Sequence, residues 1–125
     1  MNRKPSEIIQ DFIALCELSH EEYLKSKSAV ESYDKDTLSW VHKIENEDRA
    51  EERSKISTAW HKERKERRKH KNNMILYEKI HEFACNEMNK STLKRLKTLL
   101  QKQIETEQYI ESEDKVLKSR RVIEK

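Results

Sequence analysis

Apolar residues recur with a seven-residue spacing along the first third of the chain. One series of seam positions contains Ile9, Cys16, Tyr23, Val30, Thr37 and Ile44. A second series, three residues later, contains Phe12, Ser19, Ser26, Tyr33, Trp40 and Glu47. Two such series are typical of a long helix that packs along another helix, although Ser, Thr and Glu make this repeat leaky. The pattern predicts a helix over about residues 6–46, with Pro5 just before it and Ser6 as its N-cap.

A restart signal after this helix predicts a second one. In "NEDRAEE", Asp48 followed three residues later by Glu51 forms a capping box, which predicts a helix over about residues 49–88. Its apolar positions are Ile56, Trp60, Met74, Tyr77, Ile80, Phe83 and Ala84. An earlier break is also open, because Asp34 or Asp36 in "YDKDT" could cap a restart within the first helix.

A third helix follows "MNKSTLKRL", where Asn89 or Ser91 is the expected cap. We expect it to cover about residues 91–118, with a frayed tail over 119–125. Its apolar stripe contains Leu93, Leu96, Leu100 and Ile104. The three predicted helices form an all-α fold, an elongated antiparallel bundle resembling a coiled coil, in a single domain over residues 1–125.

The distribution of apolar residues suggests how the helices pair. If the first two fold back at about residue 47, facing positions have numbers that sum to about 94. Residues 8–18 would then face 74–86, both rich in apolar side chains, and the polar stretch 61–73 would face 21–33. A second reversal near residue 90 would bring Leu93–Ile104 against Leu76–Glu87. These pairings are expectations that depend on the positions of the turns.

Composition supports long helices and excludes several classes of site. The 125-residue chain has no glycine and one proline, so it lacks the glycine-rich loops that cradle phosphates or dinucleotides. Charged residues make up 41% of it, and the net charge is +3. The charge is uneven, because residues 1–60 hold 9 basic against 13 acidic residues and residues 61–125 hold 18 against 11. A basic half therefore follows an acidic half.

The basic character is densest at 60–73, "WHKERKERRKHKNN", where seven of the thirteen residues after the tryptophan are Lys or Arg. On a helix, Arg64, Arg67, Arg68 and Lys71 share one face. Such a face has three interpretations: a solvated surface paired with acidic residues of the first helix, a docking face for an acidic protein surface, or a phosphate-contacting face for nucleic acid. The lack of interleaved aromatic residues and the mild net charge count against nucleic acid.

The sequence "HEFAC" at 81–85 is the one stretch that resembles a metal-binding helix motif. His81 and Cys85 are one turn apart and could both face a metal, with His20 as the nearest third ligand. Free cysteine more often packs as a small hydrophobe, and we favour that role for Cys16 and Cys85. The sequence therefore leads us to expect no catalytic residues, no metal site and no cofactor, in a protein that is not an enzyme. Trp40 and Trp60 are expected to anchor a core or an interface.

Three segments resemble small helical coiled-coil proteins of unknown role encoded by phages and prophages of Gram-positive bacteria. They are "VHKIE" at 41–45, "KERKERRKHKN" at 62–72 and "LKRLKTLLQKQIETEQY" at 93–109. The resemblance implies a small accessory protein that works in the cytoplasm of a bacterial host cell by binding a host or phage protein. Counter-defence, toxin neutralisation and regulation of the choice between lysis and lysogeny all fit that implication.

The leading hypothesis is thus a non-enzymatic regulator or inhibitor that binds an acidic protein surface. Its expected contacts are Arg64, Arg67, Arg68, Lys71, Trp40 and Trp60. The alternatives are a nucleic-acid-binding accessory protein using the same basic face and a scaffold rod that self-assembles into homo-oligomers. We expect no membrane association, because "IIQDFIALC" is interrupted by polar residues, and the two cysteines in a chain without a visible secretory signal suggest a reducing compartment.

Overall fold

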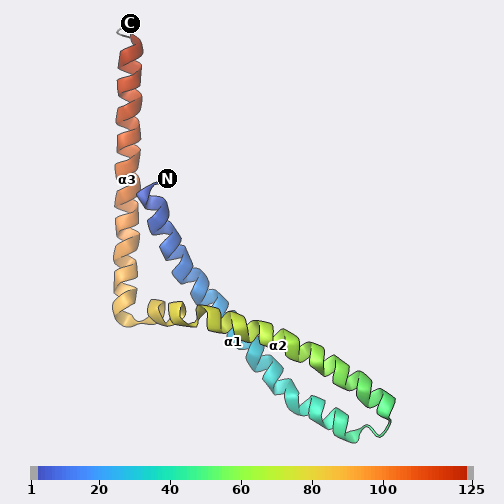
Figure 1. Cartoon of the computed structure of the whole chain (residues 1–125). Helices are drawn as coiled ribbons and strands as arrows, with labels where there is room; N and C mark the ends of the chain where they lie inside the picture. Colours follow the sequence, from blue (N-terminus) through green and yellow to red (C-terminus); the bar gives the residue numbers. More distant parts are fainter. Residues whose placement is uncertain (1–2, 124–125) are drawn as a thin grey trace. The chain divides into compact units, whose positions relative to one another are not determined.

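A computed structural model describes residues 3–123, and their side chains as far as residue 118. The chain forms three long helices, α1 (Pro5–Asn46), α2 (Ala50–Cys85) and α3 (Glu87–Ile123) (Figure 1). No strand occurs over residues 3–123, so the predicted all-α fold with three helices is confirmed. The first helix is unbroken, and the restart considered at Asp34 or Asp36 does not occur.

The chain packs as two units rather than evenly along its length. One, here called the hairpin unit, is Leu18–Phe83. The other, the terminal unit, combines the residues up to Glu17 with those from Ala84 onward. Each unit is an antiparallel pair of helical segments.

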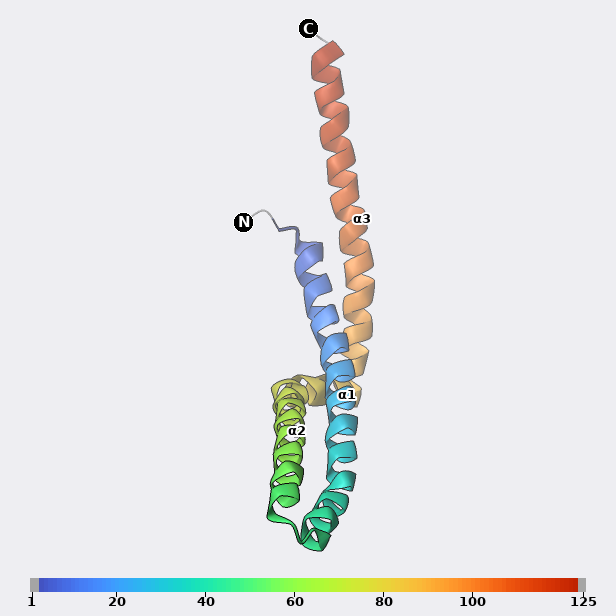
Figure 2. The same ribbon diagram turned by 90° about the vertical axis from the view of Figure 1, so that its right-hand side faces the viewer.

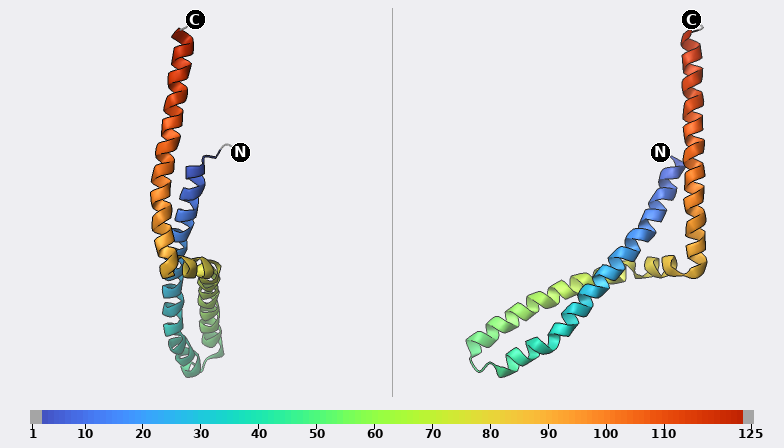
Figure 3. Two further views of the ribbon diagram at one scale, coloured as in Figure 1. Left: turned by 90° about the vertical axis from the view of Figure 1, so that its left-hand side faces the viewer. Right: turned by 180° about the vertical axis from the view of Figure 1, so that it is seen from behind.

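In the hairpin unit, α1 and α2 lie side by side and antiparallel (Figures 1 and 3). Arg67 bonds Asp34 across the pair, whereas the expected sum of 94 would place residue 27 opposite it. The expected register was therefore wrong, by seven residues at this pair and by five at Asn73 and Ser26. Glu47, Asp48 and Arg49 lie outside both helices, so the reversal is centred on residue 48 and accounts for only part of this shift. A shift of one heptad keeps the same faces in contact, so the predicted seam survives the correction.

Small polar residues form the most buried part of the hairpin seam. Ser19 is 0% exposed and Ser26 is 2% exposed, and Val30 of the same seam is also buried. The Asn73 side-chain amide of α2 donates hydrogen bonds to Ser26 Oγ at 2.8 Å and to a Glu22 carboxylate oxygen at 3.0 Å. The serines that made the heptad repeat look leaky therefore form a small polar layer between the helices.

The connection between α1 and α2 is capped by a different residue from the one expected. Glu47 Oε1 accepts a hydrogen bond from the backbone N–H of Arg49 at 3.1 Å and one from the Arg49 guanidinium at 3.2 Å. These bonds lower the pKa of the Glu47 carboxyl. The Arg49 carbonyl accepts the first helical bond from Arg53, so α2 begins one residue later than predicted and Asp48 is not its N-cap.

In the terminal unit, α3 pairs with the first turns of α1 (Figure 2). Glu107 accepts a hydrogen bond from the Ser6 backbone N–H at 3.0 Å and another from the Ser6 hydroxyl. Further along the pair, Lys97 lies 3.2 Å from Glu17. The expectation that Leu93–Ile104 face Leu76–Glu87 was therefore wrong. An apolar stripe fixes which side of a helix is buried, but it does not fix which helix covers it.

The third helix also begins earlier than the sequence suggested. The Asn86 side-chain oxygen accepts the backbone N–H of Met88 at 3.0 Å, and the Asn86 carbonyl accepts that of Lys90 at 2.9 Å. Asn86 is thus the N-cap, where Asn89 or Ser91 was expected. The expected helix 91–118 extends over Glu87–Ile123 in the structure, and the end of the predicted frayed tail, 124–125, lies outside the described residues.

The terminal unit buries apolar side chains of α1. Ile13 and Cys16 of α1 are 4% and 3% exposed. Opposite them, the stripe of α3 is half-buried and contains Leu93, Leu96, Leu100 and Ile104. The predicted stripe is therefore the packing face of α3.

None of the described helical segments has an apolar window long enough to cross a membrane.

Candidate functional site

The basic stretch of α2 has an inner and an outer side. Trp60, Glu63, Arg67, His70 and Met74 are half-buried, and their spacing of three and four residues marks the side of α2 that faces α1. Of the positions between them, Lys71 and Asn73 are also half-buried and the others are exposed. The helical register therefore divides the basic residues that the sequence grouped together, because some lie beside α1 and others point into solvent.

The inner side is occupied by intramolecular ion pairing. The Arg67 guanidinium donates a hydrogen bond to Asp34 Oδ1 at 2.7 Å. This bond lowers the pKa of the Asp34 carboxyl, and the charges of Lys71 and Arg64 lower it further. Three of the four basic residues predicted to bind a partner therefore surround one acidic residue of α1. Arg68 is exposed and has no ion pair with any described residue.

Both tryptophans are half-buried and each has a cation over its ring. The Arg64 guanidinium carbon lies 5.5 Å from the centre of a Trp60 ring, and Lys43 Nζ lies 4.6 Å from that of Trp40. Contacts of this kind contribute about 0.5–1 kcal/mol at exposed sites. Each tryptophan ring is therefore partly covered by a cation of its own helix, and the rest of its exposed surface is available for contact with a partner.

A depression beside the basic stretch is too small for a substrate. It has a volume of about 10 Å³, and it is lined by Tyr33, Thr37, Trp60, Glu63, Arg64 and Arg67. Such a space holds about one water molecule. Glu63 Oε2 is buried nearby and makes no hydrogen bond to any described residue. This part of the molecule can therefore offer a surface to a partner, but it does not enclose a small molecule.

A wider depression lies in the terminal unit, with a volume of about 450 Å³. Its charged lining residues pair with one another, because Arg3 contacts both Asp11 and Glu7. Leu100 and Ile104 of α3 form its apolar side. No unpaired charge is left to orient a substrate, and the carboxylates are not desolvated in the way that acid–base catalysis requires.

The outer side of α2 carries basic residues that the sequence analysis did not single out. Lys62, Lys65 and Lys69 are exposed and recur at three- and four-residue spacing, with Arg68 beside them. Lys69 pairs with Glu66 at 2.9 Å, whereas Lys62, Lys65 and Arg68 have no ion pair within the part of the chain that is described. Placing Trp60 and Met74 at seam positions would have identified this outer face from the sequence.

A second cluster of interest lies where α1 and α2 carry histidines. His20 Nδ1 and His81 Nδ1 are 3.2 Å apart, and the two ring planes are within 20° of parallel. The Tyr23 ring stacks on His81 with centroids 4.2 Å apart. Burial lowers the pKa of His81, and the neighbouring His20 and Lys27 lower it further while Glu82 opposes them.

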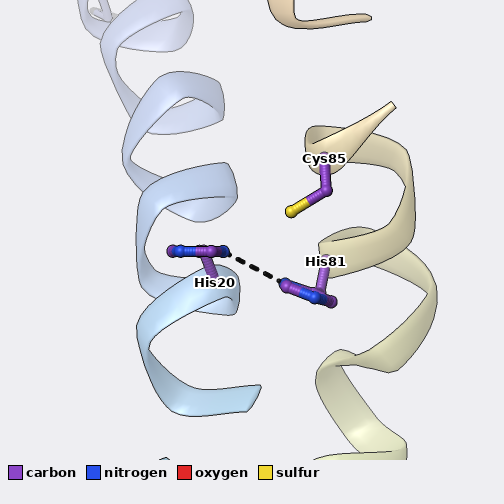
Figure 4. A group of neighbouring side chains, drawn as sticks. All are labelled: His20, His81 and Cys85. Carbon is purple, nitrogen blue, oxygen red and sulfur yellow. Dashed lines mark hydrogen bonds between the residues drawn. The ribbon is translucent and has the colours of Figure 1, made fainter. Parts of the chain in front are cut away.

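Cys85 follows His81 by one turn of the same unbroken helix (Figure 4). Its Sγ lies within 4.8 Å of a ring nitrogen of His81. The second cysteine, Cys16, is buried, and burial raises the pKa of its thiol. Neither is in a disulfide. Cys16 therefore takes the packing role expected of it, whereas Cys85 is half-buried beside a potential metal ligand.

Comparisons with known proteins do not assign this chain to a family. No family model matches the chain, and neither the characterised proteins nor the solved structures contain a match. Functional inference therefore depends on the residues and their geometry.

Proposed function

We propose that this chain is a non-enzymatic accessory protein that binds and modulates another protein through the outer basic face of α2. We define that face as Lys62, Lys65, Arg68 and Lys69. The observation that carries the proposal is that these exposed cations recur along about two helical turns, while only Lys69 has an ion pair with a described residue. Glu66 is the one exposed acidic residue among them, and because it pairs with Lys69 the face keeps an excess of positive charge.

The chemistry of the face favours an acidic partner. Arg68 can bind a carboxylate through two parallel hydrogen bonds, and the three lysines supply mobile point charges around it. The predicted contacts Arg64, Arg67 and Lys71 play a different part in this proposal, because their charges act on Asp34 of the same chain and not on a partner. Trp60 and Trp40 remain candidate contacts through the surface that their own cations leave exposed.

The biological setting is part of the proposal. The resemblance to small phage and prophage proteins supports a role inside a bacterial cell, where such a product would redirect a host or phage protein. Inhibition by occupying a surface needs no pocket and no catalytic group. This mode of action is consistent with the small volume of the depression near the basic stretch and with the paired charges that line the larger depression.

The experiment compares two triple charge reversals in a capture assay from bacterial lysate. One changes Lys62→Glu, Lys65→Glu and Arg68→Glu on the outer face. The matched control changes Lys25→Glu, Lys35→Glu and Lys102→Glu, three exposed lysines elsewhere with no ion pair to a described residue. Both alter the net charge equally. We expect the wild type and the control to retain the same partner and the outer-face variant to lose it, with unchanged helicity by circular dichroism.

A nucleic-acid role is the outcome that would replace this proposal. Binding of labelled duplex or single-stranded DNA or RNA at ~50 mM salt, falling steeply by ~200 mM, would indicate phosphate contacts. Loss of that binding in the outer-face variant, but not in the control, would assign the face to phosphates. Absence of binding at low salt would exclude nucleic acid as the partner.

Self-association is a second candidate function, favoured by exposed apolar residues on α3. Tyr109, Ile110, Val116 and Leu117 are 65%, 53%, 45% and 49% exposed. The bond from Lys4 to Glu111, at 2.5 Å, lies close to the start of α1, and α3 continues to Ile123 beyond it. A scaffold rod would bury this stripe against a second copy. Light scattering at two concentrations tests this, and a monomer at both excludes it.

A further inference from the structure

The two facing histidines have the separation that a tetrahedral metal centre requires. His20 on α1 and His81 on α2 place their Nδ1 atoms 3.2 Å apart. With Zn–N bonds of about 2.0–2.1 Å and a tetrahedral angle, two nitrogen ligands lie about 3.3 Å from each other. Ligands from two helices are thus already at the spacing that one ion would impose.

The hydrogen bond between the rings shows that at least one nitrogen is available as an electron-pair donor. In an Nδ1–H···Nδ1 contact one ring donates and the other accepts, so the accepting Nδ1 carries a lone pair. A metal ion would take the place of the shared proton, with small rotations that bring both lone pairs onto the ion. Tyr23 stacks on the His81 ring and holds its plane.

The third donor is Cys85, whose position follows from helix geometry. Residues four apart on a helix project from the same side, and α2 is continuous through both His81 and Cys85. A tetrahedral zinc centre with Zn–S of about 2.3 Å separates sulfur from nitrogen by about 3.6 Å. The sulfur lies within 4.8 Å of a His81 nitrogen, and rotation about its Cα–Cβ bond moves it over the remaining distance.

We propose that His20, His81 and Cys85 form a zinc site, with two imidazole nitrogens and one thiolate as ligands. This donor set is borderline to soft and contains no carboxylate, which suits Zn²⁺ rather than Ca²⁺ or Mg²⁺. Three protein ligands leave a fourth position for water or for a donor from a partner. Because the ligands come from α1 and α2, a bound ion also ties the two helices together.

The proposal goes beyond the docking function and does not depend on it. A metal bound by α1 and α2 would stabilise the pairing of these two helices whether or not the outer basic face binds a partner. The outer-face charge reversal leaves all three ligands intact. Loss of metal binding and loss of partner binding are therefore separate results.

The test uses the full reduced chain freed of metal with a chelator. Co²⁺ is titrated as a spectroscopic probe, and Zn²⁺ affinity is then measured by competition with a chromophoric chelator. We expect one equivalent of Co²⁺ to give thiolate charge-transfer and tetrahedral d–d bands, which one equivalent of Zn²⁺ displaces. Zinc should also raise the melting temperature of the wild-type chain.

Matched variants identify the ligands. Cys85→Ser and His20→Ala should lower zinc affinity by more than about a hundredfold, beyond what loss of a merely supporting group costs. Cys16→Ser and His61→Ala remove the other cysteine and an exposed histidine and should leave affinity unchanged. His20 is exposed, so its replacement tests the site without disturbing the core, and circular dichroism checks the fold of each variant.

Two results would overturn the proposal. The first is a wild-type chain that gives no thiolate–cobalt band, or that binds zinc no better than His20→Ala does. The second is an equal loss of affinity in Cys16→Ser and Cys85→Ser, which would show that Cys85 is not a specific ligand of the metal.

Discussion

The two units of this chain are both antiparallel helix pairs, but they bury different chemistry. The terminal unit buries Ile13 and Cys16 against an aliphatic stripe of α3. The hairpin unit buries Ser19 and Ser26 and hydrogen-bonds one of them to Asn73. The first seam gains stability chiefly from apolar area, which is non-directional. The second also buries Val30, and its polar contacts distinguish one register from another.

This difference has a consequence for function. A seam that depends on close approach and hydrogen bonds fixes the rotation of α2 about its own axis, and that rotation decides which basic residues reach solvent. Arg67 is held against Asp34, and Lys62, Lys65 and Arg68 point away from the pair. The register of α2 against α1 therefore determines both the polar seam and the side of α2 that carries the proposed docking face.

The largest effect should come from the aliphatic seam. Ile13→Ala removes a side chain that is 4% exposed. Ile→Ala replacements in cores cost about 2–5 kcal/mol, and a two-helix seam can partly collapse, so we expect about 2 kcal/mol. Urea unfolding followed by circular dichroism measures it. Ile13→Val is the control, and equal stability of the Ile13→Ala and wild-type chains would contradict an aliphatic core in the terminal unit.

The hairpin seam should respond to added size instead. Ser19 is 0% exposed, so Ser19→Leu must force the helices apart. Overpacking of this kind costs about 1–3 kcal/mol. Ser19→Ala keeps the small volume and should cost less in the same urea titration. If Ser19→Leu stabilises the chain, the seam has room for a larger residue and the close approach described here is wrong.

The polar layer should show energetic coupling between its members. Asn73→Ala leaves the Ser26 hydroxyl, 2% exposed, without its partner. An unsatisfied buried hydroxyl costs about 1–3 kcal/mol, whereas removing both partners is nearly neutral. The double variant Asn73→Ala with Ser26→Ala should therefore lose less than the sum of the single losses. Strict additivity in this double-mutant cycle would show that the bond does not hold the register.

The smallest effect should be a pH dependence of the terminal unit. Glu107 accepts hydrogen bonds from the Ser6 hydroxyl, from Gln103 and from the Ser6 backbone N–H, and these bonds lower its pKa below the ordinary 4.5. Because its folded-state pKa is depressed, its stabilisation is complete above pH 4.5 and is lost as the pH falls through the lower folded value. Glu107→Gln should show a shallower decline of melting temperature in that range. An unchanged decline would mean that Glu107 does not contribute to it.

Much of the fold follows from local sequence signals. The absence of glycine and the seven-residue repeat predict three long helices, and the repeat contains the buried Cys16, Ser19, Ser26 and Val30 of α1. It misses Ile13 and Ser6, which are buried, and it includes Phe12, which is 41% exposed. The choice of partners does not follow in the same way. The stripe of α3 packs on the start of α1. Several apolar faces in one chain can cover such a stripe equally well, and the connections between the helices decide which of them does.

The candidate sites show the same limit at the level of side chains. The sequence located the basic stretch, but it grouped Arg67 with Arg68 on one helix face. The inner and outer residues of α2 can be told apart only once the side that packs on α1 is known. His20 was named as a neighbour of His81 from an approximate register. The contact of His20 with His81 depends on the actual register of α1 and α2. If facing positions summed to 94, residue 13 would lie beside His81 instead.

The most direct test of the account is a capture assay that sets an inner basic residue against the outer ones. Arg67→Ala, the triple variant Lys62→Glu/Lys65→Glu/Arg68→Glu and the wild type are compared for retention of the same partner from bacterial lysate. The account predicts that Arg67→Ala retains the partner and that the triple variant loses it at unchanged helicity. Retention by the triple variant, or loss in Arg67→Ala alone, would contradict it.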